Sequence, residues 1–107
     1  MSARPPRTPD VPRLIWSDDA LRDIQRLHDF LAPKNPAAAV RAVEAIEGAA
    51  DILTDHPGLG RPVENLPERF HELVIPFGNA GYLARYELVG EAVVILAVRH
   101  QSEAGYG

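Results

Sequence analysis

The stretch "FLAPKNPAAAV" (residues 30–40) decides the fold, because it ends one helix and begins another within a few residues. Proline lacks a backbone donor and disfavours helical conformation in the residue before it, so a helix that contains Phe30 should end before Pro33. Asn35 is a good N-cap and Pro36 suits the first helical position, so a second helix should begin there. The short connection between them predicts an antiparallel helical hairpin.

The residues on both sides of this connection are typical of helices. Ser17 is a suitable N-cap for the first helix, and Asp18 and Asp19 favour the positive end of its dipole. The expected core-facing residues of the first helix recur at helical spacing at Leu21, Ile24, Leu27 (or His28) and Leu31. The second helix is rich in alanine, and its expected buried face consists of Val43, Ile46, Ala50 and Leu53.

Strand-like segments precede and follow the hairpin. Residues 14–17 form a short run with strand-like residues, and residues 56–69 contain so many glycines and prolines that we expect a loop. Three strands should follow at 70–76, 81–88 and 92–100, and the last is apolar on both faces, so it should be the most buried, central strand. The order β-α-α-β-β-β predicts an α+β fold, with the helical hairpin packed on one face of a mainly antiparallel sheet.

The composition is that of a small globular protein. The 107 residues suffice for a single domain, which we place at residues 14–107 after a flexible, proline-rich arm at 1–13. There is no cysteine, which excludes thiol catalysis and cysteine zinc sites, and no apolar run is long enough to span a bilayer. The N-terminus lacks the apolar core of a signal peptide, so we expect a cytoplasmic protein without a membrane partner. The net charge of −4 argues against a protein whose whole surface binds nucleic acid.

No familiar catalytic motif is present, and the four histidines lack the spacing of a metal site, so we expect neither a metal nor a cofactor. The remaining candidates for chemistry are Arg61, Arg85, Arg99, His100 and Tyr106. Arginine binds phosphate in a bidentate way, histidine transfers protons near neutral pH, and tyrosine can stack on a base. Strand alternation should send Arg99 and His100 to opposite faces unless a bulge intervenes. A structural role is the alternative for each, since Arg85 beside Glu87 is typical of a solvated ion pair.

The ordered set of segments resembles the RelE/ParE superfamily of type II toxin–antitoxin toxins. The resemblance is carried by "NPAAA" in the hairpin, "HPGLGRP" (56–62), "FHELVIPFGNAGYLARYEL" (70–88) and "AVVILAVRHQ" (92–101), and it covers over four-fifths of the chain. It implies a toxin that is held inactive in a hetero-oligomer with a cognate antitoxin. "NPAAA" and "HPGLGRP" are more similar to the ParE branch, whose members inhibit DNA gyrase and have no recognised RNase residues.

The RelE branch implies a different activity, ribosome-dependent cleavage of mRNA. In that alternative Arg61, Arg85 and Arg99 would bind phosphate, and His100 or Tyr106 would transfer protons. The charge argues against it, because no lysine follows Lys34. From residue 61 onward the chain has Arg61, Arg69, Arg85 and Arg99 against Glu64, Glu68, Glu72, Glu87, Glu91 and Glu103. Counterion release on binding nucleic acid needs a positive excess. A third alternative is an inactive relative that only forms the complex with its antitoxin.

Wrapping by an antitoxin needs exposed apolar surface and a free sheet edge. We expect the apolar surface on the outer face of the hairpin around Leu27, Phe30 and Leu31. A second expected contact lies on the sheet near Leu83 and Val94.

Overall fold

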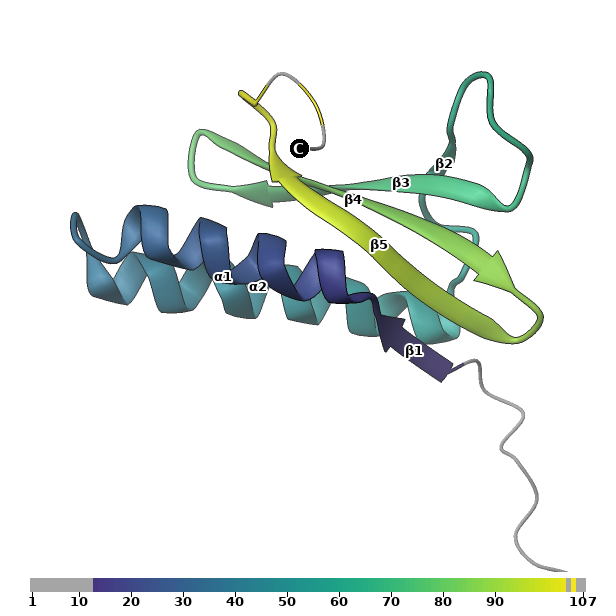
Figure 1. The fold of residues 1–107 in the computed structure, drawn as a ribbon, viewed down its shortest axis with the longest axis horizontal. Coiled ribbons are helices and arrows are strands. Elements are labelled where there is room, and N and C mark those ends of the chain that lie inside the picture. The colour runs from purple at the N-terminus through teal and green to yellow at the C-terminus, as the bar shows by residue number, and fades with distance from the viewer. Residues whose placement is uncertain (1–12, 104, 106–107) are drawn as a thin grey trace, which may run out of the picture.

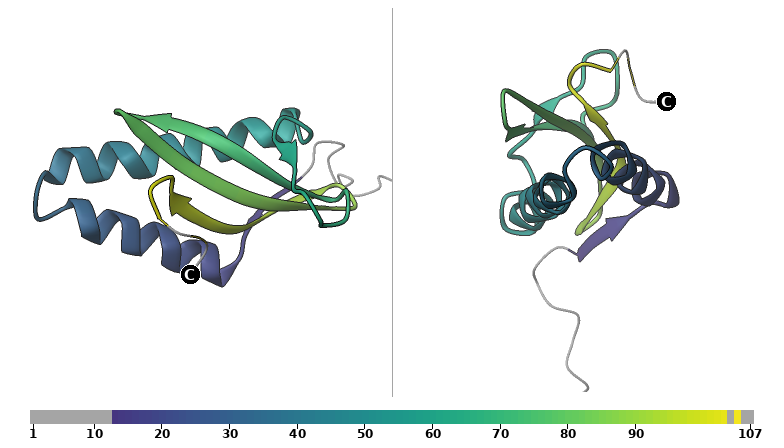
Figure 2. Two further views of the ribbon diagram at one scale, coloured as in Figure 1. Left: turned by 90° about the horizontal axis from the view of Figure 1, so that it is seen from above. Right: turned by 90° about the vertical axis from the view of Figure 1, so that its left-hand side faces the viewer.

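The computed structural model describes residues 13–103 and 105, and it confirms the α+β fold. The elements follow in the order β1 (Arg13–Trp16), α1 (Asp18–Leu31), α2 (Pro36–Asp55), β2 (Arg61–Pro62), β3 (Phe70–Phe77), β4 (Ala80–Val89) and β5 (Ala92–His100). The two helices form an antiparallel hairpin beneath the sheet (Figure 1). In the end-on view both helices lie on the same side of the sheet, and the other side carries no helix (Figure 2).

The sheet has the strand order β1-β5-β4-β3-β2, in which β1 is parallel to β5 and the other pairs are antiparallel. The prediction that β5 is the central strand is wrong, because β1 adds to the outer edge of β5 and makes β4 central. The prediction that residues 56–69 form only a loop is also wrong. Arg61 and Pro62 form a short strand that pairs with Glu72 and His71 of β3.

The helix ends lie where the sequence predicts them. The Ser17 side chain accepts the backbone N–H of Ala20 at 3.0 Å, and the Asn35 side chain accepts that of Ala38 at 3.0 Å. Strand β1 begins at Arg13, one residue inside the predicted arm, whose other residues lie outside the described part of the chain. None of the helices in the described part has the length and apolar character that crossing a membrane requires.

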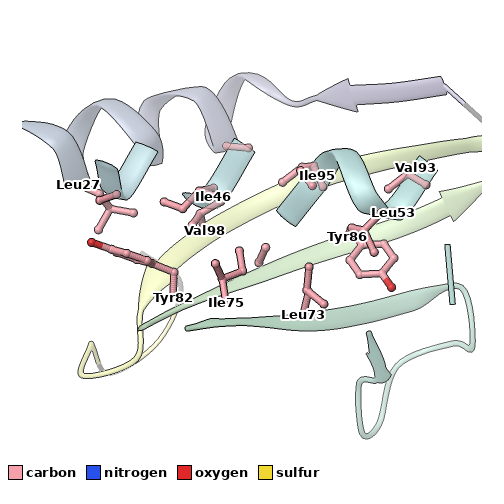
Figure 3. Packing of buried hydrophobic residues seen from close by; sticks show 14 residues of the cluster. Leu27, Ile46, Leu53, Leu73, Ile75, Tyr82, Tyr86, Val93, Ile95 and Val98 are labelled. Atoms are coloured by element: carbon pink, nitrogen blue, oxygen red, sulfur yellow. The ribbon is translucent and has the colours of Figure 1, made fainter. Parts of the chain in front are cut away.

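The core lies between the hairpin and the sheet. Figure 3 shows Leu27 of α1 beside Tyr82 at one end and Leu53 of α2 beside Tyr86 at the other. The predicted face of α2 is confirmed at Ile46, Ala50 and Leu53, which are buried. The prediction for α1 is wrong at Leu21, which is 52% exposed. The residues of α1 that are buried instead are Ala20, Asp23 and Leu27.

Candidate functional site

The three predicted arginines lie on one side of the sheet. Ala84 and Tyr86 of β4 are buried toward the helices, so Arg85 between them points to the other side. Cross-strand neighbours share a face, and Arg85 pairs with Glu72, which in turn pairs with Arg61. Leu83, on the same side as Arg85, pairs with Arg99. We call this surface, with Arg61, Glu72, Arg85 and Arg99, the open face.

His100 lies on the opposite side of the sheet. It pairs with Tyr82, and the two rings meet edge to face with centroids 5.4 Å apart. The prediction that Arg99 and His100 point to opposite faces is therefore confirmed. A bulge earlier in β5 determines which of the two residues lies on which face, because Arg85 pairs with Ala97 whereas the next residue, Tyr86, pairs with Ile95. The extra residue, Leu96, shifts the alternation by one and turns His100 toward the helices.

The guanidinium groups of the open face are bound by carboxylates and carbonyls. Arg61 Nη2 lies 3.2 Å from Glu72 Oε1, and Arg85 Nη2 lies 3.7 Å from Glu72 Oε2. Arg99 Nη1 donates to the backbone carbonyls of Glu103 at 2.5 Å and His100 at 3.3 Å. The arginines that could receive a phosphate thus already have negative or electron-rich partners within the chain.

The stretch "HPGLGRP" has a structural role that sequence reasoning missed. The Tyr86 hydroxyl donates to the Pro57 carbonyl at 2.7 Å and accepts the backbone N–H of Gly60 at 2.8 Å. Burial raises the pKa of Tyr86, which keeps the phenol protonated as a donor. A Cβ on Gly60 would lie 2.7 Å from both the Glu72 carbonyl oxygen and the Tyr86 hydroxyl. Only glycine fits there, and this contact fixes the start of β2 and therefore the position of Arg61.

Beyond the end of β1, the edge of β5 is bound by the N-cap residue and side chains of α1. Ser17 Oγ donates to the Leu96 carbonyl at 3.0 Å, and the buried Asp23 accepts the backbone N–H of Val98 at 2.9 Å. Arg26 Nη2 donates to the Val98 carbonyl at 3.4 Å. Backbone groups that a neighbouring strand would satisfy are satisfied here by a helix.

The turn after β5 is fixed by Glu103 and Ser102. One Glu103 carboxylate oxygen accepts the backbone N–H of His100 at 2.7 Å, and the other lies 2.7 Å from Arg26 Nη1. The backbone N–H of Ser102 donates to His100 Nδ1 at 3.1 Å, and Ser102 Oγ lies 2.7 Å from the same nitrogen. Nδ1 is therefore an acceptor, so neutral His100 carries its proton on Nε2.

An apolar pocket of ≈ 570 Å³ lies between α1, the β3–β4 turn and the end of β5. Its apolar lining comes from Leu27, Phe30, Leu31, Phe77 and Tyr82, and its polar lining includes Arg26, His100 and Glu103. Phe30 is 66% exposed. Leu27, Phe30 and Leu31 all line this pocket, but Leu27 is buried in the core, so the prediction of an exposed outer face is wrong at that residue. The second predicted antitoxin contact, near Leu83 and Val94, is less well supported, because the Leu83 side chain is buried.

The other predicted site residues do not form a metal site or a complete catalytic group. In residues 13–103, with Gly105, no three histidine or carboxylate side chains are grouped as metal ligands would be. Tyr106 lies outside the described residues. The predicted candidates are thus divided between an arginine-bearing open face and a histidine beside the apolar pocket.

Comparison with known proteins identifies the family. Residues 14–105 match the family described as the ParE toxin of the type II toxin–antitoxin system parDE. The chain belongs to the ParE toxin family. The superfamily resemblance drawn from "HPGLGRP" and the closing strand is confirmed, and this ParE-family toxin is a type II toxin–antitoxin toxin.

Two relatives of this ParE-family toxin carry names from the RelE branch of the superfamily. Toxin RelE3 of Caulobacter vibrioides is 37% identical over 78% of this chain and 88% of its own length. Toxin RelE1 of the same organism is 38% identical over 84% of this chain and 94% of its own length. The family model and these two relatives thus carry names from different branches of the superfamily.

Two solved structures share the fold. The chromosomal ParDE system of P. aeruginosa superimposes with a TM-score of 0.71 at 24% identity, over 84% of this chain and 96% of that chain. The toxin–antitoxin complex RelBE2 of Mycobacterium tuberculosis gives a TM-score of 0.52 at 22% identity, over 85% of this chain and 99% of that chain. At these identities the likeness supports the arrangement of the strands and the hairpin.

Proposed function

We propose that this toxin inhibits DNA gyrase by binding it, without hydrolysing nucleic acid, and that a cognate antitoxin neutralises it. The observation that carries the proposal is that the arginines of the open face already bind acceptors within the chain. Arg61 and Arg85 share the Glu72 carboxylate, and Arg99 donates to two backbone carbonyls. A nuclease that stabilises a developing phosphate charge needs its cations directed at the substrate.

The position of the candidate proton-transfer group supports the same proposal. General acid–base catalysis requires the acid or base within hydrogen-bond reach of the reacting group. His100 lies on the helix side of the sheet, against Tyr82, whereas Arg85 and Arg99 lie on the open face. A phosphodiester bound by these arginines would have the sheet between it and the imidazole. We therefore assign no RNase role to Arg61, Arg85, Arg99 or His100.

The apolar pocket is the proposed docking surface for the antitoxin. Type II toxins are paired with antitoxins, and the pocket joins the half-buried Leu31 and the exposed Phe30 to a polar rim. A helical or extended segment with apolar anchors would bury this surface, which monomers rarely leave exposed. The proposed assembly is a hetero-oligomer of toxin and antitoxin. Because gyrase is an intracellular target, we place the activity in the cytoplasm.

The alternative is a RelE-like, ribosome-dependent endoribonuclease. Two observations favour it, namely the RelE names of the relatives and the shared face of Arg61, Arg85 and Arg99. It requires mRNA to displace Glu72 from both arginines in the ribosome. It also requires a proton-transfer group other than His100.

The test of the proposal is a gyrase assay with purified toxin. Supercoiling of relaxed plasmid by gyrase should fall with increasing toxin, and cleaved DNA covalently bound to gyrase should accumulate. Adding the cognate antitoxin first should restore supercoiling, which excludes a contaminant. Unchanged supercoiling together with no trapped cleaved DNA, at toxin concentrations that arrest growth, would contradict the proposal.

A further inference from the structure

The Glu72 carboxylate lies between two guanidinium groups on the open face. One oxygen is 3.2 Å from Arg61 Nη2 and the other is 3.7 Å from Arg85 Nη2, so each arginine has its own oxygen. The Glu72 side chain is only 13% exposed, whereas that of Arg61 is 66% exposed. The carboxylate is therefore less accessible to solvent than Arg61 or Arg85, whose side chain is 32% exposed.

The backbone fixes this arrangement. Glu72 pairs with Arg61 on one side and with Arg85 on the other, so the three side chains emerge from neighbouring strands in one row. Gly60 donates to the Tyr86 hydroxyl and packs on the Glu72 backbone, so the backbone of Arg61 is held beside β3. The ion pairs thus follow from the register of three strands rather than from a chance contact of long side chains.

A phosphodiester offers the same chemistry as this carboxylate. It carries one negative charge on two non-bridging oxygens, and two guanidinium groups from neighbouring strands could each take one of them. Glu72 already supplies that charge and those two acceptors from within the chain. A phosphate approaching the same arginines would meet a carboxylate of like sign between them.

We propose that Glu72 occupies a phosphodiester-binding position between Arg61 and Arg85, and thereby prevents the open face from binding single-stranded nucleic acid. Glu72 is thus a specificity-determining residue, because the row of arginines would otherwise suit nucleic-acid binding. The inference rests on the proposed function, since a toxin that acts on a protein target gains from not binding RNA.

The chain offers a matched control on the same face. Glu87 also lies on a strand and pairs with an arginine, Arg69, at 2.7 Å. Glu87→Ala changes the net charge by the same amount as Glu72→Ala. Among the described residues, Glu87 forms an ion pair with one arginine, Arg69, which directly precedes β3, whereas Glu72 lies between two arginines. The two variants therefore separate the local site from the total charge.

The experiment measures fluorescence anisotropy of a labelled oligoribonucleotide and the matching oligodeoxyribonucleotide, in low salt and in physiological salt. Glu72→Ala should raise the affinity for both by about tenfold in low salt, the effect of one charge-assisted hydrogen bond. The dependence of log affinity on log salt should steepen by roughly 0.7 for each additional phosphate that the variant binds. Glu87→Ala should change the affinity by less than about threefold, within what one screened surface charge does. Adding Arg85→Ala to Glu72→Ala should remove the increase in affinity.

Equal effects of Glu72→Ala and Glu87→Ala would overturn the inference, and so would an unchanged affinity for both oligonucleotides or an increase for only one of them. Circular dichroism checks that each variant is folded, and Glu72→Gln, which keeps the shape and removes the charge, replaces Glu72→Ala if that variant unfolds. Ribosome-dependent cleavage by the natural protein would contradict the proposed function, but the comparison of Glu72 with Glu87 would still test the Glu72 inference on its own.

Discussion

The Tyr86 hydroxyl accepts the backbone N–H of Gly60 at 2.8 Å, and this bond joins the loop after α2 to the centre of the sheet. The same hydroxyl donates to the Pro57 carbonyl at 2.7 Å. Tyr86 is fully buried, so both loop groups are satisfied inside the protein rather than by water. The stretch that most resembles the family is thus explained by packing, and it fixes where the arginine row of the open face begins.

Replacing Gly60 by alanine should destabilise the toxin. Its Cβ would lie 2.7 Å from the Tyr86 hydroxyl and from the Glu72 carbonyl oxygen, so the loop or the ring must move. The expected loss is about 1–3 kcal/mol in the free energy of unfolding, as for other overpacked sites. Urea unfolding followed by circular dichroism measures it.

Gly48→Ala is the matched control for this prediction. Gly48 lies in the middle of α2, and its Cβ would meet nothing within 4 Å. Alanine should stabilise the helix there by up to about 1 kcal/mol. A Gly60→Ala variant as stable as the natural protein would show that the loop is not held by Tyr86.

Replacing Asp23 by alanine should also destabilise the fold. The buried carboxylate accepts the Val98 N–H at 2.9 Å, and removing it leaves a backbone donor at the edge of β5 without that acceptor. We expect a loss of about 1–3 kcal/mol in the free energy of unfolding. Asp23→Asn keeps an acceptor oxygen and should lose less.

Asp29→Ala is the control for Asp23, because Asp29 lies on the same helix with a 63% exposed side chain. It should leave the unfolding midpoint nearly unchanged. If Asp23→Ala and Asp29→Ala behaved alike, the edge of β5 would not depend on the helix.

The stability of the toxin should fall at alkaline pH. Burial, together with the nearby Glu103 carboxylate, raises the pKa of Tyr82 above its ordinary value of 10.0, and burial raises the pKa of Tyr86. The unfolded chain therefore releases these protons first, and the free energy of unfolding decreases as the pH rises above about 10. Tyr82→Phe should weaken this decrease. An identical alkaline decrease in the variant would contradict the assignment.

Replacing Phe30 by alanine should weaken antitoxin binding. Phe30 is a 66% exposed aromatic residue of the pocket, and truncating an aromatic anchor costs about 2 kcal/mol, or roughly 30-fold in affinity. Titration calorimetry with the cognate antitoxin measures the loss. Leu21→Ala removes a 52% exposed apolar side chain from the same helix, away from the pocket lining, and should bind normally. Equal losses in both variants would place the antitoxin elsewhere on α1.

The ends of the helices could be predicted because the residues that determine them are neighbours in the sequence. Ser17 and Asn35 accept the amides expected of N-caps, and Pro33 follows the end of α1. The turns between β3, β4 and β5 could be predicted in the same way, because Gly78 and Gly90 have positive φ values of 62° and 58°. Such positions favour glycine regardless of the rest of the fold.

The sites depended on contacts that the sequence does not reveal. Strand alternation predicted that Arg99 and His100 lie on opposite faces, but the bulge at Leu96 determines which residue lies on which face. The Leu96 carbonyl accepts a hydrogen bond from Ser17, which is distant in the sequence. Asp23 was not expected in the core, since its burial depends on the Val98 N–H that β1 leaves uncovered. No periodic pattern encodes either relationship.

Gyrase and mRNA are distinguished as targets most directly by measuring mRNA cleavage and gyrase inhibition with the same preparation of toxin. Translating ribosomes are incubated with the toxin, and new 5′ ends in the mRNA are mapped while plasmid supercoiling is followed in parallel. We predict no ribosome-dependent ends and a loss of supercoiling activity. Ends that arise only with ribosomes, and that disappear with a folded Arg85→Ala variant while gyrase remains active, would contradict the proposal that this toxin binds gyrase without hydrolysing nucleic acid.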